Sequence, residues 1–365
     1  MKGDMQRWTP NVASIIEHAK AIHPNTEIVS RMVSGEIHRT NYDEICVRAR
    51  KLASALEKDG YKKGDVLATL ALNTFRHLEM YFGISGMGAV THTLNFRLHP
   101  EQAVYIINHA EDKIIFCELP FIPILESLQD KFKTVEKYII LCDKSELPET
   151  TLENTISYEE YIKDGDENYE WPELEDDAAC ALCYTSGTTG NPKGVLYSHK
   201  SNIYHATSAY AALTIDKDDC ILMVVPMFHV LAWGIPYFGP MTGNKLVMPG
   251  MGMEGESLYE LIDKEGVNST FGVPTVWMQL LAYCRENNKV LDTVKNTIIG
   301  GSALSLAMLK EFDEVHNVNV IHAWGMTEMS PLGTTNLPTA EMETMSKEEK
   351  YSLQLKQGRP VFGVE

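Results

Sequence analysis

A stretch of glycine and hydroxyl residues at positions 184–194 has the composition of a phosphate-binding loop. It reads YTSGTTGNPKG. Glycine gives the backbone access to turns that other residues adopt at a cost, and successive amides in such turns can form a concave anion site. Hydroxyl groups add hydrogen-bond donors, and a lysine adds a mobile positive charge. The residues expected to bind phosphate are Thr185, Ser186, Gly187, Thr188, Thr189, Gly190 and Lys193.

The segments on either side of this loop favour the same interpretation. A strand-like run, AACALCY, precedes the loop and an apolar-periodic run, HKSNIYHATSAYAAL, follows it, which predicts a strand, the loop, the lysine and then a helix. The loop is not a Walker P-loop, because that motif needs Gly-Lys-Ser/Thr and here Lys193 lies between Pro192 and Gly194. A flexible linker is the alternative, but linkers rarely end in Pro-Lys-Gly before an amphipathic run.

A second candidate motif, HAWGMTE at positions 322–328, follows a predicted strand. Ligands collect at strand ends in open α/β sheets. A carboxylate suits a hard cation, a hydroxyl suits phosphate, and an indole face suits a base. The alternative is a core tryptophan beside a surface glutamate. The residues of this candidate are His322, Ala323, Trp324, Gly325, Met326, Thr327 and Glu328.

The segment GGSAL, at positions 300–304, carries a weaker signal. It begins with Gly300, Gly301, Ser302 and Ala303, and its glycines would allow the backbone to approach a ligand closely. A helix that starts after a glycine turn explains the segment equally well.

PMFHVLAWGIP, at positions 226–236, places His229 among apolar residues, where a histidine is more often a satisfied core residue. Its aromatic neighbours Phe228, Trp233 and Tyr237 could line a channel or simply fill the core.

Together these motifs resemble the signature of the adenylate-forming superfamily, which comprises acyl-CoA synthetases, luciferases and peptide-synthetase adenylation domains. The resemblance covers nearly the whole chain. It implies that the 184–194 loop holds the β- and γ-phosphates of ATP while a carboxylate attacks the α-phosphate. WGMTE resembles the family's Tyr-Gly-x-Thr-Glu motif, with Trp324 in place of tyrosine. By that resemblance Trp324 stacks on adenine, Thr327 bonds the α-phosphate, and Glu328 ligates Mg²⁺.

The resemblance also assigns the weaker segments. GGSAL is implied to run along the adenine and the acyl pocket, His229 to lie between the carboxylate and the phosphates, and the aromatic residues near it to line the acyl channel. The implied catalytic residues are Thr185, Lys193, His229, Thr327 and Glu328. TEIVSRMVSGEIHRTNYDE and the His229 segment look most like bacterial medium-chain fatty-acyl-CoA synthetases, with methylmercaptopropionate-type ligases as a related alternative.

Composition indicates a soluble globular protein. The 365 residues are 44% hydrophobic and 22% charged, and a net charge of −18 argues against nucleic acid or anionic membrane as a partner. The seven cysteines lie mostly in apolar runs and predict reduced core thiols in a cytoplasmic protein. Cys180 and Cys183 would lie on opposite faces of a strand, so a zinc or redox pair is not expected.

Strands and helices alternate from Asp65 onward, which predicts parallel sheets with right-handed crossovers. The uncharged run 220–244 contains three prolines and three glycines, so it predicts a strand, a loop and a short helix instead of a membrane span.

The expected fold is therefore α/β: the large N-terminal domain of an adenylate-forming enzyme, with two layered αβα subdomains, mostly parallel sheets and no C-terminal domain. Subdomain one is placed at about 60–215 and subdomain two at about 1–59 plus 216–340. Residues 341–365 are taken as the start of a missing third subdomain.

The predicted activity of the intact protein has two steps. A carboxylic acid, expected to be a medium-chain fatty acid, reacts with Mg-ATP to give acyl-AMP and pyrophosphate, and CoA then displaces AMP. The family's ribose-binding aspartate, hinge residue and adenylation lysine would lie beyond residue 365, so this chain is expected to adenylate poorly. The alternatives are an adenylation domain that loads a carrier protein, and a module that binds nucleotide or acyl-AMP without turnover. The resemblance leaves a homodimer open.

Overall fold

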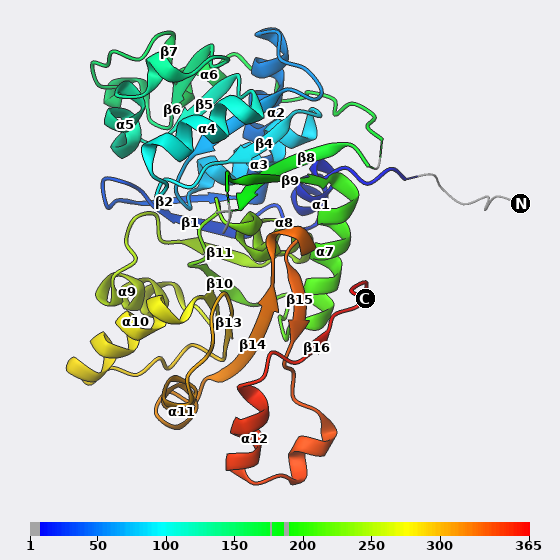
Figure 1. The fold of residues 1–365 in the computed structure, drawn as a ribbon, viewed down its shortest axis with the longest axis vertical. Coiled ribbons are helices and arrows are strands. Elements are labelled where there is room, and N and C mark those ends of the chain that lie inside the picture. Colours follow the sequence, from blue (N-terminus) through cyan, green and yellow to red (C-terminus); the bar gives the residue numbers. More distant parts are fainter. Residues whose placement is uncertain (1–7, 176, 186–189) are drawn as a thin grey trace, which may run out of the picture.

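Two β-sheets with helices packed around them make up the fold (Figure 1). The computed structural model describes residues 8–175, 177–185 and 190–365. In Figure 1 the strands from β3 to β9 lie in the upper part of the molecule, and those from β10 to β16 lie below them. Strands β1 and β2, from the start of the chain, pair with the lower sheet.

The upper sheet has seven strands in the order β7-β6-β5-β3-β4-β8-β9. All neighbours are parallel except β8 and β9. Parallel neighbours need crossover connections, and here helices supply them. The strands are β3 (Val66–Leu70), β4 (Val90–Thr93), β5 (Ile114–Cys117), β6 (Lys137–Ile140), β7 (Thr155–Ser157), β8 (Ala179–Thr185) and β9 (Lys193–Ser198). The helices of this part are α3 (Phe75–Gly86), α4 (Pro100–Ala110), α5 (Ile122–Glu126) and α6 (Tyr158–Ile162), with short 3-10 turns η1 (Leu119–Phe121), η2 (Gln129–Lys131) and η3 (Lys144–Glu146).

The lower sheet has nine strands in the order β16-β15-β14-β13-β12-β10-β11-β1-β2. Its centre is parallel and both edges are antiparallel. The strands are β1 (Glu27–Arg31), β2 (Ile37–Asn41), β10 (Cys220–Met223), β11 (Lys245–Met248), β12 (Ser269–Gly272), β13 (Asn296–Ile299), β14 (Asn319–Gly325), β15 (Leu332–Thr335) and β16 (Arg359–Pro360).

Helices flank both sheets. They are α1 (Ala13–Ile22), α2 (Tyr42–Lys58), α7 (His199–Ala212), α8 (Ile235–Thr242), α9 (Gly255–Glu265), α10 (Pro274–Glu286), α11 (Leu306–Glu314) and α12 (Lys347–Gln354), with short turns η4 (Val230–Gly234), η5 (Thr327–Met329) and η6 (Ala340–Thr344). The predicted α/β class with mostly parallel sheets is confirmed.

The uncharged run 220–244 folds as predicted into a strand (β10), a loop and a short helix (α8). Pro226 lies in the loop, Pro236 lies at the start of α8, and Gly243 closes α8 with a φ of 75°, whereas Gly239 and Pro240 lie inside the helix. In the described part of the chain, no helix is both long and apolar enough to cross a membrane. The cysteines are all free and buried, and burial raises the pKa of Cys180 to about 12.

The helix predicted from the run that starts at His199 is confirmed, but a strand that was not predicted precedes it. A strand, β9, comes between the loop and the helix, and it pairs antiparallel with β8 so that Lys193 lies opposite Thr185. The helix α7 begins only at His199, where the Ser198 side chain accepts a hydrogen bond from the Ser201 amide. Apolar periodicity identified the helix but gave no signal for the short edge strand, which depends on its partner β8. The four residues 186–189 between the strands lie outside the described residues.

Helix α3 is the central element of the core, because every one of its twelve residues is buried. Buried polar groups on it are therefore hydrogen-bonded, as burial requires. His77 contacts the Thr69 hydroxyl and the Leu72 carbonyl, each at 3.0 Å, and Glu79 binds Arg48 at 2.6 Å. Helix α3 packs against α1 and α2 and touches β1 of the other sheet, so it joins the two halves.

Asn73, two residues before α3, ties the segment between β3 and α3 to the end of β10 and the loop that follows it. Its side-chain amide donates to the carbonyls of Met223 at 2.7 Å and Val225 at 2.8 Å. Its carbonyl oxygen accepts from the Met227 amide at 2.7 Å. One buried side chain thus satisfies three backbone groups of the other half and fixes where the segment leading to His229 begins.

We expect Asn73→Ala to reduce the free energy of unfolding by about 3 kcal/mol, because three buried backbone groups lose their partner. The measurement is the urea unfolding midpoint at constant m-value. Asn108→Ala is the matched control. Asn108 also bridges two backbone groups, the Lys131 carbonyl and the Lys133 amide, but at a partly exposed position where water replaces it. Equal losses in the two variants would contradict the bridging role of Asn73.

Burial lowers the pKa of His77 to about 4, while its hydrogen bond to the Leu72 carbonyl acts in the opposite direction. An unfolded histidine titrates near pH 6.5, so stability from the neutral ring is complete above about pH 6.5 and is lost as the pH falls toward 4. His77→Gln keeps a donor and an acceptor but cannot titrate. Between pH 7 and pH 5 its unfolding free energy should fall by about 2 kcal/mol less than that of the parent protein. Equal losses of unfolding free energy in the two proteins between pH 7 and pH 5, measured by urea unfolding, would contradict this prediction.

Candidate active site

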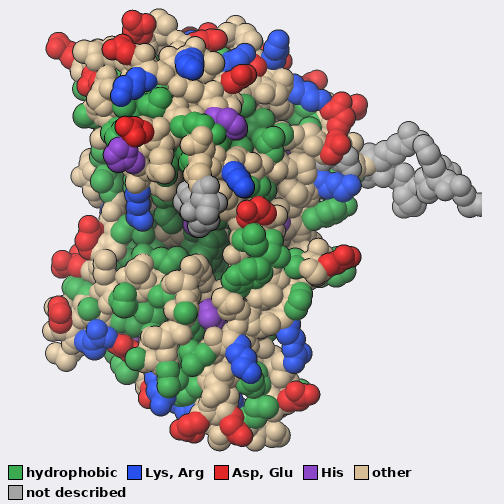
Figure 2. Space-filling view, in the orientation of Figure 1, with side chains coloured by type: hydrophobic (Ala, Val, Ile, Leu, Met, Phe, Trp, Pro, Cys, Tyr) green, Lys and Arg blue, Asp and Glu red, His purple; other side chains and the backbone are tan. Residues whose placement is uncertain are grey.

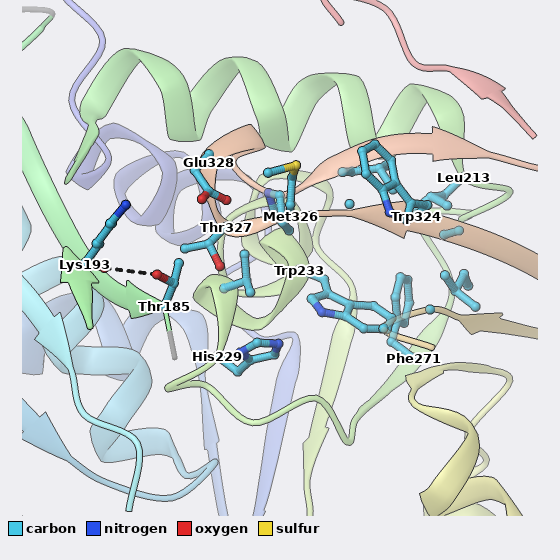
Figure 3. Close-up of a pocket in the computed structure, with 18 of the residues that line it drawn as sticks. Thr185, Lys193, Leu213, His229, Trp233, Phe271, Trp324, Met326, Thr327 and Glu328 are labelled. Carbon is cyan, nitrogen blue, oxygen red and sulfur yellow. Dashed lines mark hydrogen bonds between the residues drawn. The ribbon is translucent and has the colours of Figure 1, made fainter. Parts of the chain in front are cut away.

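A cavity of about 660 Å³ opens where the carboxyl ends of strands from both sheets meet (Figure 3). Its walls come from the β8–β9 pair, the segment after β10, the ends of β12 and β13, and the turn between β14 and β15. Thirteen of the residues predicted from the sequence line it: Thr185, Gly190, Lys193, His229, Trp233, Gly300, Gly301, Ala323, Trp324, Gly325, Met326, Thr327 and Glu328.

One end of the cavity is polar. Thr185 and Lys193 face each other across the β8–β9 pair, and the Thr185 hydroxyl donates to the Lys193 carbonyl at 3.5 Å. Figure 3 shows Thr327 and Glu328 on the same side as these two residues. Among the described residues that line the cavity, Lys193 and Glu328 are the ones that carry charge. Hydroxyls, a lysine and a carboxylate are suited to an anion together with a hard cation.

Tyr197 on β9 fixes the turn that carries Thr327 and Glu328. Its hydroxyl donates to the Thr327 carbonyl. Burial, with a smaller effect of the nearby Cys183, raises the Tyr197 pKa, so the phenol keeps the proton that it donates. The strand that the sequence did not predict therefore positions both Lys193 and the Thr327 turn.

The other end of the cavity is apolar, and His229 lies between the two ends. Trp233 and Phe271 form this end, and Figure 3 shows their rings beside each other, away from Lys193. Burial, together with the positive charge of Arg97, lowers the pKa of His229. His229 is therefore a neutral imidazole at neutral pH, able to donate from one nitrogen and accept at the other.

The segment that carries His229 and Trp233 has a strained backbone. Residues 230–234 all have positive φ, at 40°, 41°, 49°, 56° and 85°, and the first four are not glycine. Each such residue costs about 1–2 kcal/mol, so surrounding contacts must hold the turn. Thr93 donates to the Phe228 carbonyl at 3.1 Å and Tyr81 donates to the Met227 carbonyl. The strain directs Trp233 into the cavity, and no sequence pattern predicted it.

Glycine is required at two points of the wall. A Cβ on Gly300 would lie 2.9 Å from the Ala323 carbonyl oxygen and 3.2 Å from the Trp233 ring. A Cβ on Gly325 would lie 2.1 Å from the Pro331 carbonyl oxygen. The ends of β13 and β14 can therefore approach the cavity closely only because these side chains are missing.

Some predicted residues lie elsewhere. His322 is buried on β14, and its Nδ1 donates to the Leu355 carbonyl at 3.0 Å, so it faces α12. Tyr237 is buried in the core on α8, where Asn202 donates to its hydroxyl at 3.4 Å. Ser302 and Ala303 are exposed beyond the cavity wall.

Phe228 lines a neighbouring cavity of about 290 Å³ that shares Thr185, His229 and Thr327 with the larger one. Ser186, Gly187, Thr188 and Thr189 are outside the described residues.

Sequence reasoning missed several lining residues. They are Asn191, Leu213, Val230, Phe271, Ile298, Pro331 and Leu332. Phe271 and Ile298 lie near the carboxyl ends of predicted strands, and the rule that ligands collect there could have indicated them. Leu213 and Leu332 gave no such signal, because a leucine beside a cavity looks the same in sequence as a leucine in the core.

The sequence matches the family of AMP-binding enzymes over residues 16–365. This chain belongs to the AMP-binding enzyme family. Over its whole length it is 46% identical to a medium-chain-fatty-acid–CoA ligase from Ectopseudomonas oleovorans and covers 67% of that protein. It is 44% identical, again over its whole length, to a 3-methylmercaptopropionyl-CoA ligase from Ruegeria lacuscaerulensis and covers 68% of it. A long-chain-fatty-acid–CoA ligase from Thermus thermophilus is 40% identical over 96% of the chain, which covers 63% of that relative.

Solved structures share the fold. The anthranilate CoA ligase AuaEII, in complex with anthranoyl-AMP, matches the whole chain with a TM-score of 0.86 at 21% identity, and the match covers 67% of that protein. The N-terminal domain of FACL13 from Mycobacterium tuberculosis matches 97% of the chain with a TM-score of 0.81 at 24% identity, over 83% of that domain. The predicted superfamily and the predicted N-terminal-domain fold of this AMP-binding enzyme are confirmed. The chain spans about two thirds of the length of its curated relatives.

We expect Tyr197→Phe to weaken AMP binding by roughly fivefold to tenfold, because one hydrogen bond of about 1 kcal/mol to the Thr327 carbonyl is lost. Isothermal titration calorimetry with AMP measures this. Tyr204→Phe is the control, since Tyr204 is an exposed tyrosine of α7 away from that carbonyl. If Tyr197→Phe binds AMP as tightly as Tyr204→Phe does, Tyr197 does not position the Thr327 turn.

Proposed function

We propose that this chain forms the ATP- and acid-binding part of an AMP-forming acyl-CoA ligase that acts on a medium-chain fatty acid. The observation that carries the proposal is the division of one cavity into a polar end and an apolar end, with His229 between them. Phosphates fit the first end and an acyl chain fits the second. The relatives at 40–46% identity are CoA ligases by name, which supports the same reaction class.

The two-step reaction assigns a task to each side chain. A carboxylate oxygen of the acid attacks the α-phosphorus of ATP, the bond to the β-phosphate oxygen breaks, and pyrophosphate leaves. Lys193 and Thr185 bind the departing phosphates, while Thr327 donates to the α-phosphate. The thiol of CoA then attacks the acyl carbon and AMP leaves. Positioning and charge stabilisation supply most of the catalysis in such phosphoryl chemistry.

The adenine and the acid occupy opposite walls in this proposal. Trp324 is 38% exposed at the mouth of the cavity, so an indole face is available for stacking on the base. The backbone at Gly300 lies between the two walls, because a Cβ there would meet the Ala323 carbonyl oxygen at 2.9 Å and the Trp233 ring at 3.2 Å. The neutral imidazole of His229 can hydrogen-bond the acid without competing for the cation.

Magnesium fits the donor set through Glu328. Mg²⁺ commonly binds one or two carboxylates together with substrate phosphates, and one carboxylate lies at the polar end. Within the described residues no group of three or more His, Cys, Asp or Glu could hold a metal by itself. Bound there, Mg²⁺ would neutralise phosphate charge. The free buried cysteines support a cytoplasmic location, and the proposal includes a homodimer by resemblance to the family.

The test combines nucleotide calorimetry with pyrophosphate release in the presence of acetate, octanoate or palmitate. Because Lys193 is assigned to the departing phosphates, Lys193→Ala should weaken ATP binding at least tenfold, or about 1.4 kcal/mol, with a smaller effect on AMP. Glu328→Gln should weaken ATP binding only when Mg²⁺ is present. Octanoate should give the highest turnover of the three acids.

Lys356→Ala is the control for Lys193→Ala, and Glu341→Gln is the control for Glu328→Gln. Both control residues are exposed and lie outside the cavity, so these variants should bind ATP like the unaltered chain. Wild-type affinity for ATP and AMP in both Lys193→Ala and Glu328→Gln would reject the proposed site. Nucleotide binding without pyrophosphate release, in this chain and in a form extended to the length of its relatives, would favour a binding module instead.

A further inference from the structure

His205 on α7 contacts two segments of the candidate site without lining the cavity. Its Nε2 accepts a hydrogen bond from the Leu332 amide at 3.1 Å. Leu332 begins β15 and lines the cavity just after the Thr327 turn. The same imidazole ring packs against Gly234, the last residue of the strained turn that carries Trp233. One buried ring therefore lies between the nucleotide wall and the acid wall.

The contact with Gly234 leaves no free space. A Cβ on Gly234 would lie 2.7 Å from Cε1 and 2.8 Å from Nδ1 of His205. A shift of the turn toward α7 must therefore move the ring, and a shift of the ring must lengthen or bend its hydrogen bond to the Leu332 amide. Packed interiors transmit such displacements because they are close to incompressible.

In the described part of the chain, the ring has one nitrogen with a hydrogen bond and one without. Since Nε2 accepts, the proton is on Nδ1, and Nδ1 has no hydrogen-bond partner among the described residues. Burial also lowers the pKa of His205 to about 4, so the ring is neutral. An apolar ring would fill this volume without burying an unpartnered N–H, which is costly. What the nitrogen at Nε2 adds to packing is a directional link to the Leu332 amide.

We propose that His205 is a positioning residue that couples the acid-binding turn 230–234 to the nucleotide-binding turn before Leu332. The inference rests on the proposed function of the cavity. When one ligand binds, it restricts the motion of the wall that it contacts, and His205 passes this restriction to the other wall. The second ligand then binds with a smaller loss of conformational entropy. This gives positive coupling between the carboxylic acid and the nucleotide.

The chain contains a close match for His205 in His199, at the start of the same helix. His199 is buried, its Nδ1 accepts from the Val12 amide at 3.1 Å, and its Nε2 has no partner in the described part of the chain. Burial lowers its pKa to about 4 as well. It differs in location, because it contacts the segment before α1 instead of the cavity walls.

The experiment measures the Kd of octanoate by calorimetry with and without saturating α,β-methylene-ATP, which cannot release pyrophosphate. The ratio of the two Kd values is the coupling factor, and we expect roughly fivefold or more for the unaltered chain. His205→Phe keeps a ring but loses the acceptor and should bring the factor close to one. His205→Gln can still accept and should retain part of the coupling. His199→Phe should leave the factor unchanged while losing comparable thermal stability.

A coupling factor near one in the unaltered chain, or an unchanged factor in His205→Phe, overturns the inference while leaving the proposed function intact. Failure of the unaltered chain to bind either octanoate or the ATP analogue overturns both. If His205→Phe does not fold, Gly234→Ala tests the same contact from the other side, because its methyl group is forced against the ring. It should lower the coupling factor although the histidine is still present, and an unchanged factor would again overturn the inference.

Discussion

The site exists because the two separate sheets are held in one relative arrangement by buried polar contacts as well as by apolar packing. Asn73 is the clearest of these contacts, since its single amide satisfies three backbone groups across the boundary. The fully buried helix α3 lies behind it. A buried amide with all its hydrogen bonds made specifies one arrangement, whereas apolar contact alone tolerates sliding. The cavity is formed by this one arrangement of the strand ends.

Strain is concentrated at the point where the two halves meet. Four successive non-glycine residues in the left-handed region would not persist in an isolated peptide. The residues just before the turn are held by Thr93 of β4 and Tyr81 of α3, and His205 limits the other end of the turn. The backbone conformation that directs Trp233 into the cavity is thus stabilised by residues far away in sequence, as expected where strain serves a site.

The described polar end of the cavity contains few ionic groups, although acidic side chains are scattered over the face of the protein in Figure 2. The protein carries a net charge of −18, which disfavours an anionic ligand at long range, yet the described cavity wall contributes one lysine and one carboxylate. A nucleotide bound there must be neutralised locally, by hydroxyls, backbone amides and a cation that arrives with the phosphates. His229 also contributes hydrogen bonds without adding charge, because burial and the positive charge of Arg97 lower its pKa.

The sequence by itself determined the α/β class, the order of most strands and helices, and the motifs around Lys193 and Glu328, because periodicity and glycine-rich turns are local properties. Tertiary structure alone decided the rest. Strand β9 forms only by pairing with β8, and the left-handed turn forms only between two sheets. Whether a leucine or a phenylalanine lies beside the cavity or in the core depends on which strand ends are brought together. The Asn73 and His205 contacts join residues separated by more than a hundred positions, so no local pattern could encode them.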